Sequence, residues 1–277
     1  FFSSRYGKDL GKLVSITLLI AMCGFSATYV KSLVVLFNPI FPLLSSWQLS
    51  GILVSLILLI TLRGGLIAII STDLLSFLLT ILFFPLITFY VWKFNSVPLD
   101  SFTLTSVVDS GSKIIPPSFV ISLVVLTMFT YIMAPWYGQK LFSAKSEKTA
   151  YLSVFTAAFI IFCLYGLVIF SASLLQVNGV QLSNPEQALP YILNQILPIG
   201  LRGIGYSLLF AASATTLTGV WNAMTAMCVS DFLDAKLAKS SNRTLVITIG
   251  FAVVSYILSN IFVDKIFNKL ILANIPI

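Results

Sequence analysis

Apolar residues fill this chain in long blocks that are separated by short polar segments. A helix needs about 20 residues to cross the ~30 Å hydrocarbon core of a bilayer, and each block is close to this length. A shorter apolar stretch would suit a buried helix of a soluble protein equally well. The pattern predicts seven spanning helices, near residues 13–37, 45–62, 66–92, 117–139, 150–175, 199–230 and 244–262.

Composition supports the same class of protein. Of the 277 residues, 58% are hydrophobic and 9% are charged, whereas a soluble domain carries about 25% charged residues. A soluble core of this size has no room for so much apolar surface. We therefore expect an all-α membrane protein in which residues 1–277 form a single transmembrane domain.

The basic residues predict how the helices are oriented. If successive spans alternate in direction, ten of the sixteen Lys and Arg residues fall on the side of residue 1 and five on the other side. Cytoplasmic loops carry the excess of Lys and Arg, so we expect residue 1 in the cytoplasm, with the protein in a bacterial inner membrane. Because the basic residues are scattered and form no basic face, nucleic acid is excluded as a partner.

The two ends of the sequence suggest a longer chain. It begins with Phe1 rather than Met, which is typical of a start inside a longer protein. The tail from Lys265 to Ile277 is too short and too polar to cross a bilayer alone. We expect it to lead into a further helix.

The residue types argue against an enzyme. The chain has no His, and its three cysteines lie in or beside apolar blocks without metal-ligand spacing. A zinc site and His-based catalysis are therefore excluded within this sequence, and the spans contain no paired carboxylates. We expect no catalytic residue, no organic cofactor and no metal ion other than sodium.

Asp73 is an acidic residue about eight positions into the third predicted span, or ~11 Å along a helix. A carboxylate at such a depth costs at least ~2.5 to 3.5 kcal/mol unless it faces a cavity, a cation or a hydrogen-bonding group. One interpretation places Asp73 on an ion pathway. The other is an interhelical hydrogen bond, or a carboxylate that reaches the inner interface.

The sixth predicted span contains the strongest polar cluster, which runs from Ala211 to Asn222. Ala212, Thr215 and Thr216 share one helix face because they are three or four positions apart. Their hydroxyl and carbonyl oxygens suit a hard cation such as sodium. Small and hydroxyl residues are also the usual ones where membrane helices pack closely, and the cluster taken alone favours packing.

Three further features carry less specific signals. Gly64 and Gly65 predict a tight cytoplasmic turn between the second and third spans. Lys31, a cation within the first span, is expected to snorkel towards the outer face. Trp136 and Tyr137 at the end of the fourth span have two interpretations. They belong either to an aromatic belt at the membrane interface or to a substrate path beside a Pro-broken helix.

Taken together, these residues resemble the sodium:solute symporter family. Four motifs follow the family's order over essentially the whole chain: Arg5-Tyr6-Gly7, Gly64-Gly65-Leu66 with Thr72-Asp73, Gln139 to Ser146, and Gly200-Leu201 followed by Ala212, Thr215-Thr216 and Asn222. The resemblance implies part of a five-plus-five inverted-repeat transporter core, with a substrate site near the bilayer midplane.

The resemblance also implies roles for individual residues. The Ala212 carbonyl and the Thr215 and Thr216 hydroxyls would form half of a sodium site, and the family's first core helix, which would precede Phe1, would supply the rest. Asp73 would lie on the path of sodium to the cytoplasm. Sodium binding thereby becomes a better explanation of the sixth span than packing.

The function that follows is sodium-coupled symport of a small organic solute, such as proline or another amino acid, a sugar or an organic anion. Trp136, Tyr137, Gln139 and Asn222 would lie near that solute. The solute itself does not transfer from the family, because Ser76 and Trp221 depart from its usual residues. Two alternatives stay open: a solute-sensing membrane module of a signalling kinase, and a truncated fragment that does not transport.

Overall fold

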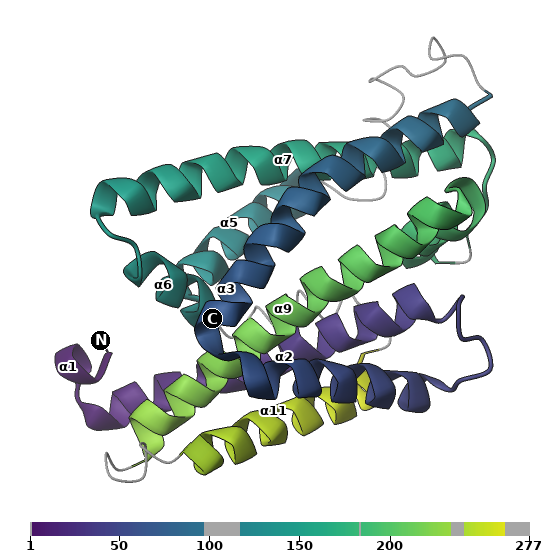
Figure 1. The fold of residues 1–277 in the computed structure, drawn as a ribbon. Coiled ribbons are helices and arrows are strands. Elements are labelled where there is room, and N and C mark those ends of the chain that lie inside the picture. Colours follow the sequence, from purple (N-terminus) through teal and green to yellow (C-terminus); the bar gives the residue numbers. More distant parts are fainter. Residues whose placement is uncertain (1, 97–116, 183, 234–240, 264–277) are drawn as a thin grey trace. The chain divides into compact units, whose positions relative to one another are not determined.

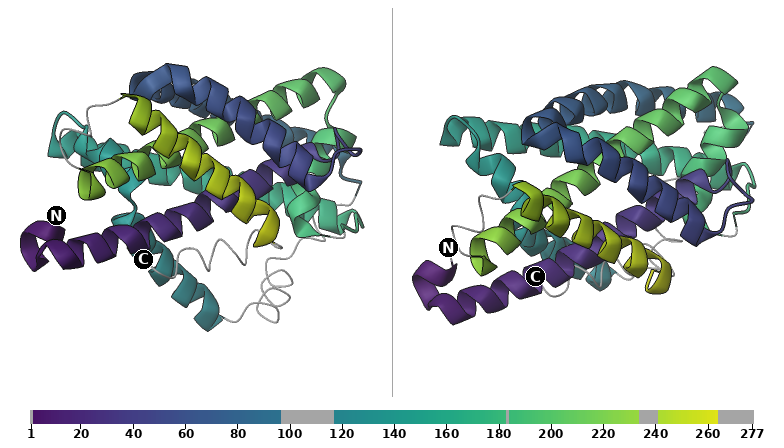
Figure 2. Two further views of the ribbon diagram at one scale, coloured as in Figure 1. Left: turned by 90° about the horizontal axis from the view of Figure 1, so that it is seen from below. Right: turned by 60° about the horizontal axis from the view of Figure 1, so that its bottom comes forward.

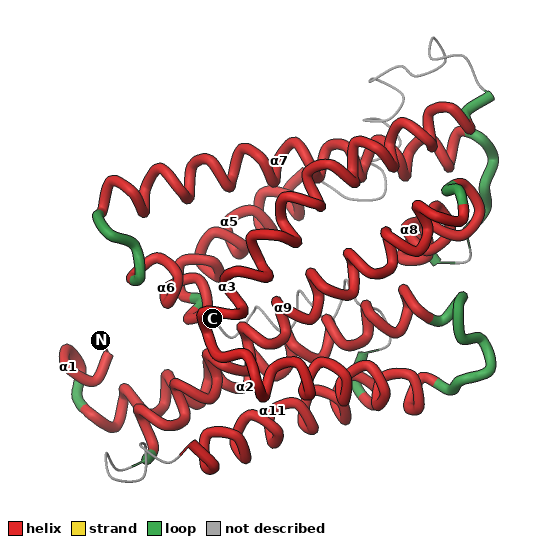
Figure 3. The backbone as a smooth tube through the Cα atoms, viewed as in Figure 1, coloured by secondary structure: helices red, strands yellow, loops and turns green. Residues whose placement is uncertain are grey.

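The computed structural model of the protein describes residues 2–96, 117–182, 184–233 and 241–263. This part of the chain consists of helices, turns and loops and contains no strand (Figure 3). Within the described residues, five segments are long and apolar enough to cross a membrane: Lys8–Phe37, Asp73–Phe94, Glu147–Val177, Ile199–Phe232 and Arg243–Ile261. Two shorter apolar helices, Ser46–Thr61 and Pro117–Phe129, stand where the remaining two spans were predicted. The helical membrane class is thereby confirmed.

Six long helices carry these apolar segments (Figure 1). They are α2 (Lys8–Phe37), α3 (Ser46–Phe94), α5 (Pro117–Met133), α7 (Glu147–Val177), α9 (Ile199–Phe232) and α11 (Ser241–Ile261). Short helical pieces lie between them: α1 (Phe2–Tyr6), α6 (Pro135–Phe142), η2 (Pro185–Gln187), α8 (Ala188–Tyr191) and η3 (Ile192–Ile196). The first, fifth, sixth and seventh predicted spans match α2, α7, α9 and α11 to within a few residues.

The turn predicted at Gly64 and Gly65 is not a separate loop, because helical backbone continues through both glycines from Ser46 to Phe94. The ribbon of α3 nevertheless bends sharply along its course (Figure 1). Each glycine costs a helix about 1 kcal/mol relative to alanine, but it does not prevent helical backbone. The 49 residues of α3 have a contour length of ~73 Å at ~1.5 Å per residue. This exceeds twice the hydrocarbon thickness, so α3 has room for both predicted apolar segments.

The fourth predicted span, residues 117–139, is also corrected. Helix α5 ends at Met133, and Ala134 adopts extended backbone with φ −69° and ψ 115°. Proline disfavours helical backbone in the residue before it and fits the first turn of a new helix. Pro135 therefore ends one helix and begins α6. Most of the predicted connection 94–116 lies outside the described residues, whereas the connection 177–198 contains the short pieces η2, α8 and η3.

Gly7 explains the first sequence motif in conformational terms. Its backbone has φ 94°, in the region that favours glycine, and it separates α1 from α2. The Arg5-Tyr6-Gly7 motif thus marks the start of a spanning helix.

The chain divides into two compact units, residues 1–80 with 199–277 and residues 81–198. In the first unit, α2, α9 and α11 pack against one another (Figure 2), and we call these helices the three-helix core. In the second unit, the Thr88 hydroxyl on α3 lies 3.0 Å from that of Ser171 on α7. The Asn178 side chain after α7 bonds Asn95 and Ser96 after α3. The prediction of a single domain stays a prediction.

A buried threonine pair in the three-helix core gives a test of this packing. Oγ1 of Thr225 on α9 lies 2.9 Å from Oγ1 of Thr248 on α11. Interhelical hydrogen bonds in membranes contribute about 0.6 to 1.7 kcal/mol, so we expect Thr225→Val to lower the unfolding free energy by about this amount. Adding Thr248→Val should cost little more, which thermal unfolding in detergent can measure. Two fully additive losses would show that the pair does not interact.

Candidate cation site

The three predicted sodium ligands lie close together near the middle of α9. The Ala212 carbonyl accepts a hydrogen bond from the Thr215 hydroxyl at 3.1 Å and another from the Thr216 hydroxyl at 2.9 Å. Helical backbone produces this convergence, because a side chain three or four positions along the chain lies over the carbonyl of the earlier residue. One carbonyl and two hydroxyl oxygens thus form a small cluster, as the spacing predicted.

This cluster lies on the less buried side of α9. Ala212, Thr215 and Thr216 are half-buried, whereas Leu217 and Trp221 are 0% exposed. At ~100° per residue, Asn222 lies within about 20° of Thr215 around the helix, and it is also half-buried. We call the side that carries these four polar or small residues the threonine face. Its four residues are less buried than Leu217 and Trp221.

Hydrogen bonds to the same helix do not by themselves distinguish a cation site from packing. Hydroxyls elsewhere bond to their own helix in the same way, for example Thr17 to the Leu13 carbonyl. The contrast lies within α9. On its buried side, the Thr218 hydroxyl reaches Thr61 on α3 at 2.7 Å, whereas both hydroxyls of the threonine face bond only to Ala212 among the described residues. Within the part of the chain that the structure describes, their side-chain hydrogen bonds are therefore intrahelical, unlike that of Thr218.

The cluster has the chemistry of a partial site for a hard cation. Such ions prefer carbonyl, carboxylate and hydroxyl oxygens, and a shell commonly has about six of them. Because a threonine hydroxyl rotates, each oxygen can offer a lone pair to an ion while its hydrogen points elsewhere. Three neutral oxygens supply about half of the shell, and other residues must supply the rest. Within the described residues, no group of three His, Cys, Asp or Glu side chains is placed to hold a metal ion.

Asp73 belongs to the same compact unit as the threonine face. It lies on α3, and its side chain is half-buried. Three residues later, Ser76 is buried at 6% exposure. This position within α3 is compatible with both interpretations of the role of Asp73.

The other residues singled out in the sequence lie on α6 and α2. Trp136, Tyr137 and Gln139 are on α6 in the second unit, directly after the helix break at Pro135. The Tyr137 side chain is 40% exposed. Lys31 is half-buried on α2, six residues before the helix ends. That distance is ~9 Å, which is within reach of a snorkelling lysine.

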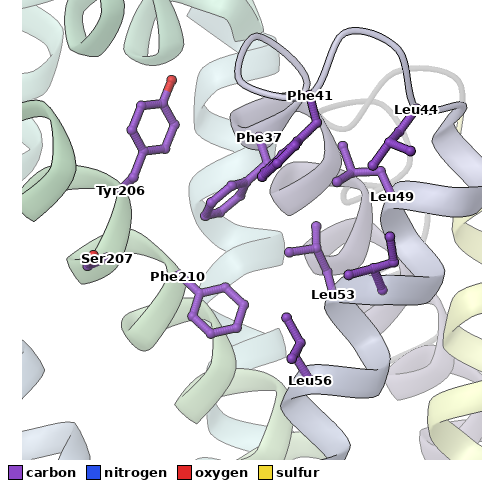
Figure 4. Close-up of a pocket in the computed structure, with 10 residues that line it drawn as sticks. Phe37, Phe41, Leu44, Leu49, Leu53, Leu56, Tyr206, Ser207 and Phe210 are labelled. Atoms are coloured by element: carbon purple, nitrogen blue, oxygen red, sulfur yellow. The ribbon is translucent and has the colours of Figure 1, made fainter.

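The first unit also contains an apolar cavity of about 390 Å³ (Figure 4). It lies where α2 ends, α3 begins and the first part of α9 passes. The ring of Phe37 packs on Tyr206 and Phe210 there, with centroids 5.4 and 6.0 Å apart. Its described lining comprises Phe37, Phe41, Leu44, Leu49, Ile52, Leu53, Leu56, Tyr206, Ser207 and Phe210. None of the three predicted sodium ligands lines this cavity, so it is distinct from the threonine face.

Sequence reasoning overlooked the role of Trp221. The sequence marks Trp221 only as a departure from the family's usual residue, whereas the side chain is completely buried and its indole N–H donates to Ser255 on α11. One signal was present in the sequence: Thr218, Trp221 and Thr225 are spaced three and four residues apart. This spacing places them on a single helix face, on which Trp221 lies about 120° from Thr215 and about 140° from Thr216.

Comparisons with known proteins add independent findings. The sequence model of the sodium:solute symporter family matches residues 1–270. A solved structure described as the substrate-bound outward-open state of a Na⁺-coupled sialic acid symporter, with a novel Na⁺ site, is similar with a TM-score of 0.70. The identity is 16%, and the match covers 97% of this chain and 61% of that one. At this identity the likeness concerns the fold. A search of curated proteins gives no significant match.

Proposed function

Because this chain belongs to the sodium:solute symporter family, we propose that the protein is a secondary transporter that couples sodium entry to uptake of a small organic solute. The family comprises transporters rather than enzymes. The observation that carries the proposal is the convergence of the Thr215 and Thr216 hydroxyls on the Ala212 carbonyl. These oxygens lie on α9 at positions that are less buried than Leu217 and Trp221.

Each candidate residue has a role in this proposal. The Ala212, Thr215 and Thr216 oxygens bind sodium, and Asp73 offers a negative charge along the route of the ion to the cytoplasm. Trp136, Tyr137, Gln139 and Asn222 contact or approach the solute. Coupling requires no chemical step, because sodium needs only to bind one conformation more tightly than the other.

The solute is proposed by class: an amino acid such as proline, a sugar or an organic anion. The structurally similar protein is described as a Na⁺-coupled sialic acid symporter, and sialic acid is both a sugar and an organic anion. Proline, glucose and sialic acid therefore form a reasonable first panel of radiolabelled probes for this protein.

Uptake into proteoliposomes tests the proposal. We expect at least one probe to accumulate above its external concentration when an inward sodium gradient is imposed. A potassium gradient of the same size should produce only equilibration, and collapse of the sodium gradient by an ionophore should release the accumulated probe. Accumulation of the same extent in potassium would contradict sodium coupling. Absence of accumulation for any solute in a widened panel would contradict transport itself and favour the sensor alternative.

A further inference from the structure

Trp221 is the largest completely buried side chain of the described residues. Its indole Nε1–H donates a hydrogen bond of 3.1 Å to the Ser255 hydroxyl on α11. The Ser255 Oγ lies 2.6 Å from the Ser26 Oγ on α2. One hydrogen-bonded chain thus joins α9, α11 and α2, and we call it the Trp221–Ser255–Ser26 chain.

All three members of this chain are 0% exposed and fully satisfied. The Ser255 hydroxyl is 2.7 Å from the Phe251 carbonyl, and the Ser26 hydroxyl is 3.0 Å from the Cys23 carbonyl. Whichever serine donates to the other, the second serine can donate to its own backbone, and Ser255 always accepts from the indole. An unpaired polar group buried in an apolar core costs about 1 to 3 kcal/mol. The Trp221–Ser255–Ser26 chain therefore favours one rotation of each of the three helices about its own axis.

This setting determines where the threonine face points. Trp221 follows Thr215 by six residues and Thr216 by five, so at ~100° per residue the indole lies about 120° and 140° away from them. The Trp221–Ser255–Ser26 chain therefore binds α9 on the side opposite the cation ligands. A rotation of α9 by ~20° would move an atom ~5.5 Å from the helix axis by about 2 Å. A preorganised site tolerates only about 0.5 Å.

We propose that Trp221 is a positioning residue for the candidate cation site, acting through the Trp221–Ser255–Ser26 chain. The proposal rests on the sodium-binding role assigned to the threonine face in the proposed function. Trp221 does not touch the ion. It fixes the rotation of α9 so that the Ala212, Thr215 and Thr216 oxygens converge with the remaining ligands.

Sodium titration of the purified protein tests this role without knowledge of the solute. The measurement is the sodium concentration that produces half of the maximal sodium-dependent thermal stabilisation, at constant ionic strength with choline as the replacement cation. Trp221→Phe keeps an aromatic ring but removes the N–H donor, and Ser255→Ala removes the acceptor. We expect each variant to raise the half-maximal sodium concentration about 3- to 10-fold, and the double variant to be no worse than the more affected single one.

Thr28→Val is the matched control, because it removes a buried hydroxyl of α2 whose hydrogen bond goes to the Phe25 carbonyl of the same helix. It should leave the half-maximal sodium concentration unchanged. Ser26→Ala interrupts the chain at its other end and provides a second reading if Trp221→Phe does not fold.

The alternative outcomes are distinct. In one, variants of the Trp221–Ser255–Ser26 chain melt at a lower temperature without sodium and yet keep the wild-type half-maximal sodium concentration. That result would overturn the positioning role and leave only a structural one. An equal increase in the Thr28→Val control would overturn it as well. A wild-type protein that does not respond to sodium would instead contradict the proposed function.

Discussion

Replacing Thr215 or Thr216 by alanine should raise the sodium concentration needed for half-maximal uptake about 10- to 100-fold. Each substitution removes one oxygen from the cluster around the Ala212 carbonyl. A hydrogen bond or comparable contact to a charged group contributes about 1.5 to 3 kcal/mol, which corresponds to this range in affinity. Initial uptake rates measured as a function of external sodium give the value directly.

Stability separates this effect from a packing defect. Alanine has a higher helix propensity than threonine by up to about 0.7 kcal/mol, and both hydroxyls bond only within their own helix among the described residues. The variants should therefore unfold at about the wild-type temperature in the absence of sodium. Thr215→Ser and Thr216→Ser keep an oxygen and should retain sodium affinity close to that of the wild type.

Thr17→Ala is a suitable control for these substitutions. It removes a half-buried hydroxyl of α2 that bonds to the Leu13 carbonyl of its own helix. Its sodium dependence should match the wild type. Normal sodium dependence in both Thr215→Ala and Thr216→Ala would exclude these residues as ligands.

Replacing Asp73 by asparagine should lower the maximal rate of sodium-coupled uptake by about tenfold or more. A carboxylate within ~8 Å of a cation stabilises it by about 2 kcal/mol at an effective dielectric constant of about 20. Loss of this charge raises the barrier for sodium release to the cytoplasm by a similar amount. The rate at saturating sodium measures the change, and Asp73→Glu should preserve most of the activity.

The asparagine variant also discriminates between the two interpretations of Asp73. Asparagine keeps the capacity to form hydrogen bonds but not the negative charge. If the carboxylate served only as an interhelical hydrogen-bonding group, Asp73→Asn would transport at a rate near that of the wild type. Asp9→Asn, at an exposed position near the start of α2, is the control for a general loss of negative charge and should have no effect.

The class of fold was predictable from the sequence because the hydrophobicity of long residue blocks determines it. Apolar blocks of spanning length leave the backbone little choice other than helix, since every peptide group within lipid must bond within its own segment. The helix ends were predicted well where polar residues interrupt the blocks, as on both sides of α7. The end of the fourth span was placed at residue 139 rather than at Met133, because apolar residues continue across the break at Ala134–Pro135.

The glycine pair at residues 64 and 65 shows a second limit. Glycine permits a turn but does not require one, so the sequence could not decide between a turn and the continuous helix α3. A proline at the same place would have been decisive, because it lacks the amide N–H that helix propagation needs.

For the candidate site, the spacing of Ala212, Thr215 and Thr216 sufficed to predict that their oxygens converge. Helix geometry fixes such local relations. The role of Trp221 was not predictable, because it depends on Ser255 and Ser26, which lie 34 and 195 residues away in sequence and meet it only through packing. A polar stripe within an apolar span indicates that bonding groups exist on other helices but not which residues provide them.

Equilibrium binding of ²²Na⁺ to the purified protein tests whether the threonine face of α9 binds sodium. We expect saturable binding that unlabelled sodium displaces and potassium does not. This binding should be lost in the Thr215→Ala/Thr216→Ala double variant and kept in Thr17→Ala. Wild-type binding of ²²Na⁺ by a folded double variant would show that the threonine face is not the sodium site.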